Sequence, residues 1–173
     1  SCAVTAAGGV SCWGLARHGQ VGPQAVGEAV SAPQGVKGLE SGVTAVAAGG
    51  SHTCALLATG AVKCWGASVP GPPALVDVPA LPARVIALAA GEHHTCALTA
   101  PGRVVCWGQN RYGQLGNGVS GVCATPVPVI SEELDPPSNF PPYHIVKKPL
   151  LGVKSIVAGN SHTCALMTDG SVY

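Results

Sequence analysis

The sequence predicts an all-β protein built from a repeated hairpin unit, and three observations support this fold class. A short phrase recurs four times, and three of its copies carry two cysteines ten residues apart. Each copy has a glycine at the same point between its two halves, and none shows a helical period of apolar residues. The first halves of the copies are residues 1–4, 51–56, 94–98 and 161–166, and the second halves are residues 10–14, 62–66, 104–108 and 171–173.

The glycine indicates the turn of each hairpin. If Cys54 lies opposite Cys64, the centre of symmetry is Thr59 and the connection has three residues, 58–60. Such hairpins commonly use a type I turn followed by a residue at positive φ, where glycine is favoured. Residues 168–170 fit this turn. Residues 100–102 carry Pro101 at the disfavoured second turn position, so we expect a different turn in that copy.

This register brings paired cysteines within reach of each other. Directly opposed residues in a non-hydrogen-bonded antiparallel pair have Cα atoms about 4.5 Å apart, and a disulfide accepts roughly 4.4–6.8 Å. We therefore predict the hairpin disulfides Cys2–Cys12, Cys54–Cys64 and Cys96–Cys106. Cys164 has no second cysteine in its copy, and Cys123 belongs to no hairpin pair, so both are expected to be unpaired within the chain.

Two other states of these cysteines stay open. The thiols could remain reduced and pack as small apolar side chains, or His52, Cys54 and Cys64 could supply zinc ligands, although structural zinc sites usually use closer spacings. The recurring histidines, His52, His94 and His162, are interpreted as structural residues that hydrogen-bond the backbone near the start of the strand.

Two further strands are expected around each hairpin. Residues 43–49, 85–91 and 153–159 are rich in small and β-branched residues and end in Ala-Gly, which predicts a strand upstream of the hairpin. A glycine-rich stretch follows the hairpin at residues 13–22 and 107–116. Prolines at residues 125–129 then indicate an outer edge strand.

These motifs resemble the regulator of chromosome condensation (RCC1-like) repeat. The resemblance rests on Ala-Gly, His-Thr-x-Ala-Leu, Gly-x-Val-x-x-Trp-Gly and Gly-Gln-Leu-Gly, and it covers essentially residues 1–173 with a departure at residues 66–75. It implies a β-propeller with blades of four antiparallel strands, seven in the complete ring. The chain holds about three and a half repeats of roughly 45–50 residues, so we expect a partial propeller whose parent sequence continues in further repeats.

Composition argues against several functional classes. Only 10% of the residues are charged and the net charge is +1, so the basic patch that nucleic-acid binding requires is missing and no nucleic-acid partner is expected. No apolar run is long enough for direct membrane insertion. No cofactor or metal is predicted. Cysteine recurs in all four copies and histidine in three, whereas a catalytic nucleophile with its base would be a singular feature, so no catalytic residue is assigned.

One segment interrupts the repeat and is the candidate site for partner contact. Residues 131–149 form a proline-rich insertion, which we expect to be a loop on the surface of the propeller. A surface excursion that packs on its own propeller is an equally acceptable interpretation, and the acidic cluster is expected to be solvated. The candidate contact residues are Glu132, Glu133, Asp135, Phe140, Tyr143, Lys147 and Lys148.

The sequence therefore favours a non-catalytic scaffold or interaction module of a larger protein. Eight cysteines, mostly paired, indicate an oxidising compartment, which places the module outside the cell or at the cell surface. Its expected partners are other protein chains, copies of itself included, and algal ciliary-hair or cell-surface glycoproteins are a suitable setting. Two alternatives are a guanine-nucleotide exchange factor for a small GTPase and a secreted enzyme inhibitor, both implied by the resemblance.

Overall fold

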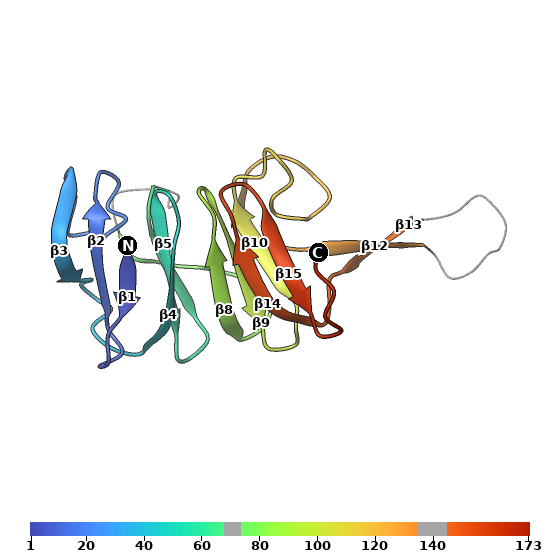
Figure 1. Ribbon diagram of the computed structural model, residues 1–173, viewed down its shortest axis with the longest axis horizontal. Coiled ribbons are helices and arrows are strands. Elements are labelled where there is room, and N and C mark those ends of the chain that lie inside the picture. The colour runs from blue at the N-terminus through green and yellow to red at the C-terminus, as the bar shows by residue number, and fades with distance from the viewer. Residues whose placement is uncertain (68–73, 135–144) are drawn as a thin grey trace.

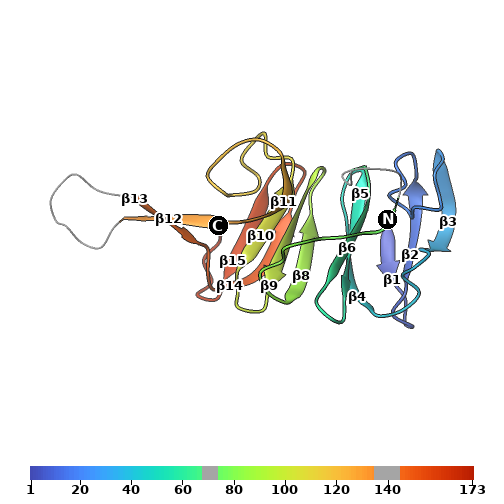
Figure 2. The same cartoon turned by 180° about the vertical axis from the view of Figure 1, so that it is seen from behind.

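The computed structural model describes residues 1–67, 74–134 and 145–173, and these residues form strands and turns without a helix. All strand pairs are antiparallel. Four sheets stand side by side in a row, and a fifth, two-stranded sheet extends from one end of it (Figures 1 and 2). The first sheet contains β1 (Cys2–Val4), β2 (Val10–Leu15) and β3 (Ala29–Gly35).

The second and third sheets each have the four strands that the repeat predicts. They follow chain order, so each consists of the upstream strand, the two hairpin strands and an outer strand. The second contains β4 (Val43–Ala48), β5 (His52–Leu57), β6 (Val62–Gly66) and β7 (Val76–Asp77). The third contains β8 (Val85–Ala90), β9 (His94–Thr99), β10 (Val104–Gly108) and β11 (Cys123–Pro128). The fourth contains β14 (Val153–Ala158) and β15 (Thr163–Met167).

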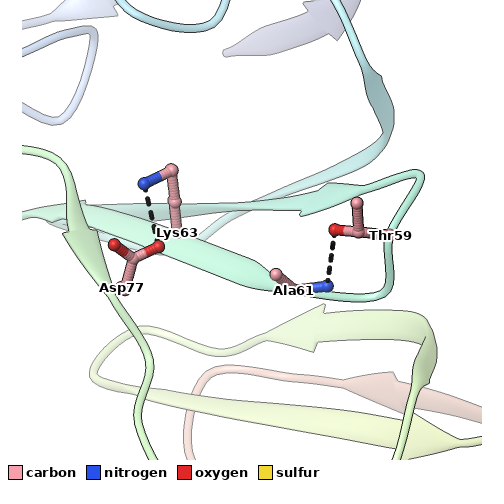
Figure 3. Close-up of polar contacts among 4 residues, drawn as sticks. All are labelled: Thr59, Ala61, Lys63 and Asp77. Carbon is pink, nitrogen blue, oxygen red and sulfur yellow. Dashed lines mark hydrogen bonds and ion pairs between the residues drawn. The ribbon is translucent and has the colours of Figure 1, made fainter.

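The hairpin turns have the predicted length and glycine conformation. The amide of Leu57 donates to the carbonyl of Ala61 at 2.9 Å, which encloses residues 58–60. Gly60 has φ = 88°, in the left-handed region that glycine tolerates best. Figure 3 shows Thr59 accepting from the amide of Ala61 at 3.3 Å, and the 2.8 Å ion pair of Lys63 and Asp77 between β6 and β7.

The expectation of a different turn around Pro101 is wrong. Thr99 donates to the carbonyl of Arg103 at 2.9 Å and accepts from the amide of Gly102 at 2.8 Å, which is the pattern of the other copies. Gly102 likewise has φ = 75°. The third copy keeps this turn because its middle residue donates no backbone hydrogen bond there, so the missing N–H of proline carries no penalty.

The core lies between neighbouring sheets. Three apolar clusters fill the three junctions along the row, and each combines residues from two adjacent sheets. Both faces of β5 and β9 are covered in this way, so Ala55 and Ala97 are fully buried. Small side chains in these central strands allow adjacent sheets to approach closely.

The junction of the first two sheets contains a fully buried tryptophan. Trp65 has 0% exposure, and its Nε1 donates to the carbonyl of Gln20 at 3.0 Å. The hydroxyl of Thr53 donates to the same carbonyl at 2.8 Å. We call the apolar pocket that encloses the indole of Trp65 the filled socket. Its walls are Val10, Val21, Val36, Leu39, Val43 and Ala55.

Strands form at both ends of residues 131–149, where we expected a loop. β12 (Ile130–Leu134) pairs with β13 (Ile145–Pro149), and Pro149 lies opposite Ile130. The two ends favour pairing because isoleucines stand at the strand ends and Glu132 lies directly opposite Lys147. This β12–β13 hairpin extends away from the row of sheets (Figure 1).

Candidate functional site

The six repeated cysteines form three disulfides within their own hairpins. The bonds are Cys2–Cys12, Cys54–Cys64 and Cys96–Cys106, and the Cα atoms of each pair lie 4.1 Å apart. The strand register places each pair directly opposite. With Cys54 and Cys64 joined to each other, neither is a thiolate that could bind zinc. Among the described residues, no three histidine, cysteine or acidic side chains gather closely enough to hold a metal ion.

The other two cysteines are half-buried thiols. Cys123 begins β11 opposite Gly108, and the side-chain amide of Asn117 donates to its sulfur at 3.6 Å. Cys164 lies in β15 opposite Val157. Its place in the repeat corresponds to Cys54 and Cys96, as the sequence indicates.

The repeated histidines connect one sheet to the next. We predicted that they bind backbone near the strand start; for His94 this is wrong, and His52, on which the backbone of Glu92 also acts, has its short hydrogen bond to a threonine side chain as well. Nε2 of His52 lies 2.7 Å from Oγ1 of Thr95, and Nε2 of His94 lies 2.9 Å from Oγ1 of Thr163. The partner is in each case the threonine of the following repeat, because the ring reaches across the junction between sheets.

The hydrogen bonds of Thr163 determine the tautomer of its histidine. The hydroxyl of Thr163 donates to the carbonyl of Gln114 at 3.1 Å, so its oxygen must accept from His94. Nε2 of His94 therefore carries the proton, and its Nδ1 is buried without a hydrogen-bond partner among the described residues. The same nitrogen of His52 is also buried, and the backbone of Glu92 is the polar group that acts on this ring.

This environment favours neutral imidazole rings. Burial, together with the charges of His93 and His94, lowers the pKa of His52 from 6.5 to about 4. Burial, with a smaller effect of His162, also lowers the pKa of His94. Neutral rings held between sheets suit a structural role.

The Ala-Gly motif makes room for these rings. A Cβ added to Gly49 would overlap the ring of His52 and the carbonyl oxygen of Gly91 in the next repeat. A Cβ on Gly91 would overlap His94 and the carbonyl oxygen of Gly159 in the same way. The glycine, histidine and threonine of the repeat therefore form one contact that joins successive sheets.

The charged residues that we assigned to partner contact lie on the β12–β13 hairpin. Lys147 and Glu132 form a 3.4 Å ion pair, and about half of each side chain is exposed. Glu133 lies on β12, and Lys148 lies on β13 with an exposed side chain. The other three candidates, Asp135, Phe140 and Tyr143, lie outside the described residues.

A second exposed surface was missed by the sequence analysis. Residues 109–122 form a loop held by Asn110, whose side-chain Nδ2 donates to Asn117 and to the carbonyl of Val119, and whose Oδ1 accepts from Leu115. Asn110 is fully buried, whereas Tyr112 is 70% exposed. The glycine-rich pattern marked this stretch as part of the repeat, but no signal in the pattern distinguishes the asparagine that orders it.

Comparisons with known proteins match the chain to a family of repeats. Models of the regulator of chromosome condensation (RCC1) repeat match residues 43–69 and 85–114, and also residues 101–166. A search of curated proteins gives no match. No helix among the described residues is long and apolar enough to cross a membrane.

Several solved structures resemble the chain over 99% of its length. Human WBSCR16 is 26% identical with a TM-score of 0.71, and 44% of that chain is covered. Prp20p of Saccharomyces cerevisiae, described with its binding properties to Gsp1p and histones, is 23% identical with a TM-score of 0.70 and 41% coverage. Yeast RCC1 (Prp20) bound to Kap60 is 24% identical with a TM-score of 0.69 and 40% coverage.

The chain thus spans roughly two-fifths of the length of these structures. Their likeness agrees with the four-stranded antiparallel sheets, the inter-sheet contacts and the two matched repeat models. The chain belongs to the family of proteins with regulator of chromosome condensation (RCC1) repeats, and its sheets are blades of a β-propeller.

Proposed function

We propose that the chain is a non-catalytic protein-interaction scaffold that works in an oxidising compartment, outside the cell or at its surface. The observation that carries this proposal is the disulfide across the hairpin of three successive blades. Disulfides persist in secreted and surface proteins and are rare where glutathione keeps thiols reduced.

The position of these bonds supports a lasting structural role. Cys12, Cys54, Cys96 and Cys106 have 0% exposure, so reductants meet little sulfur surface in the folded chain. A bond that closes a loop this short restricts the unfolded chain by about 2–3 kcal/mol. The bonds in the first three blades compensate for a core with few aromatic side chains.

The residues that recur in every blade are engaged in structural contacts. His52 and His94 bind threonines of the following blade, and the repeated cysteines are bonded to each other. This supports a scaffold role, because the polar and sulfur groups of these repeated side chains are already occupied in contacts within and between blades. The partner is another protein chain, and contact is made on the β12–β13 hairpin.

The compartment is tested by mapping thiols in protein from its native source. Alkylation without reduction, followed by mass spectrometry, should leave the six bonded cysteines unmodified and label Cys123 and Cys164 unless these bind another chain. Free thiols at Cys54 and Cys64 in native protein would contradict the oxidising compartment.

The contact surface is tested by cross-linking the native assembly with a lysine-specific reagent. Lys147 and Lys148 on the hairpin should give cross-links to another chain. Lys37 and Lys154 are also exposed but lie on the body, and they serve as matched controls. Intermolecular cross-links from the control lysines alone would place the contact elsewhere.

A further inference from the structure

A cavity of about 330 Å³ lies beside β11, the edge strand of the third sheet. We call it the proline site. It is lined from β10, β11, the end of β13 and the segment before β8, by residues that include Ala80, Pro82, Val105, Pro126, Pro128 and Pro149. A volume of this size is at the lower end of the range for ligand sites, and it suits one large side chain with a neighbouring polar group.

The apolar floor of the proline site is particular to the third sheet. Val105 lies opposite Pro128 and directly precedes the second cysteine of its hairpin. In the second sheet this cross-strand position is taken by the ion pair of Lys63 and Asp77 (Figure 3), and in the first sheet by a serine and a glycine. Val105 is only 5% exposed. The third sheet thus has an apolar floor where the second has two charges.

Arg103 contributes a positive charge to the same cavity. It is exposed and lines the proline site, whereas the first and second hairpins have glycine and alanine at this position. Arg17, Arg84 and Arg111 each contact an acceptor or an aromatic ring. The guanidinium of Arg103 has no partner among the described residues. A guanidinium offers only donors, and a carboxylate is the group that it binds in a bidentate manner.

The walls of the proline site are held in place by the fold. Ala80 has φ = 56° and is the only described non-glycine residue with a positive φ, a conformation that persists only where the surroundings impose it. The segment is fixed on both sides, since Val78 donates to the carbonyl of Val62 and Ala100 donates to that of Arg84, both at 2.9 Å. Proline side chains lose almost no conformational entropy when they are covered. A ligand therefore meets a preformed surface, which favours binding.

We propose that the proline site binds an acidic segment of a partner protein in which an aromatic side chain adjoins a carboxylate. The ring packs between the prolines on Val105, and the carboxylate accepts two hydrogen bonds from Arg103. An aromatic ring suits this surface because it buries a large apolar area with few rotatable bonds.

The inference rests on the proposed role as a protein-interaction scaffold and adds the chemistry of a partner. The proline site adjoins the β12–β13 hairpin, because Pro149 lines the cavity and lies opposite Ile130 at the base of the hairpin. A segment bound at the hairpin can therefore continue into the proline site.

The site is tested by methyl NMR titration with the blocked peptide acetyl-Gly-Glu-Phe-Gly-amide, which has no terminal charge. The peptide should shift the methyl signals of Val104 and Val105, which line the cavity. It should leave those of Val10 and Val62 unchanged, which hold the position of Val104 in the first two hairpins. Peptides with glutamine in place of the glutamate, or alanine in place of the phenylalanine, should bind at least tenfold more weakly.

Protein variants separate the charge from the floor. Arg103→Gln should bind the glutamate and glutamine peptides equally, because the donor to the carboxylate is gone. Arg17→Gln removes an exposed arginine of the first sheet and should keep the tenfold preference. Val105→Lys together with Pro128→Asp reproduces the pair of the second sheet and should abolish binding. If this double variant does not fold, Arg103→Gln decides the outcome, since Arg103 is exposed.

Equal binding of the glutamate and glutamine peptides to the original chain would overturn the role of Arg103. Shifts at Val10 and Val62, or none at Val105, would overturn the site. Binding of 3-phenylpropionate as tight as that of the peptide would assign the site to a small carboxylate and contradict the partner segment. Cross-links from Lys147 in the native assembly, without peptide binding, would overturn the proline site alone and leave the proposed function standing.

Discussion

Acidification should destabilise the protein through His52. In the folded state the pKa of His52 is about 4, against 6.5 for an unperturbed histidine. Between pH 4 and pH 6.5 the unfolded chain therefore binds a proton at His52 that the folded chain does not bind. The stabilising preference for the neutral ring is complete above pH 6.5 and is lost progressively as the pH falls toward 4.

The size of this effect follows from the difference between the two pKa values. One pKa unit corresponds to about 1.4 kcal/mol, so the complete loss is about 3 kcal/mol. At pH 5 the linkage relation gives a loss of about 2 kcal/mol from this residue. His94, whose pKa is also lowered by burial, changes stability in the same direction.

The assay is urea unfolding followed by tryptophan fluorescence at pH 7.5 and pH 5.0. The matched variant is His52→Gln, whose amide can still bond Thr95 but does not titrate in this range. It should be less stable than the original chain at pH 7.5 and should lose about 2 kcal/mol less on acidification. The same pH dependence in both proteins would refute the assignment of the proton to His52.

Three further predictions concern the junctions and the hairpins. Gly91→Ala should lower the free energy of unfolding by about 1–3 kcal/mol, because the new Cβ overlaps His94. The control Gly35→Ala, which has open space around it, should change this free energy by less than about 0.5 kcal/mol. Urea unfolding of both variants measures the two effects. Trp65→Ala should cost about 3–5 kcal/mol through the cavity at Gln20, measured in the same way, and a loss under about 1 kcal/mol would contradict the filled socket. Replacing Cys54 and Cys64 together by alanine should lower the free energy of unfolding by about 2–3 kcal/mol. A thiol reductant should then lower the melting midpoint less than it does in the original chain, as measured by melts with and without the reductant.

The sequence by itself determined the hairpin unit. The distance from one cysteine to its partner is short, so the strand register and the position of Gly60 depend on a few residues around each turn. The four-strand order of the second and third sheets followed from the same repeat, since each strand is adjacent in the chain to the one it pairs with. The compartment and the partner surface remain predictions that rest on these features.

Only the tertiary structure decided how the units meet. The hydrogen bond of His52 to Thr95 and the close approach of Gly49 to the carbonyl oxygen of Gly91 join residues about one repeat apart. No local pattern shows which side chain of the next blade a ring will reach. The pairing of residues 130–134 with 145–149 depends on strand ends separated by prolines.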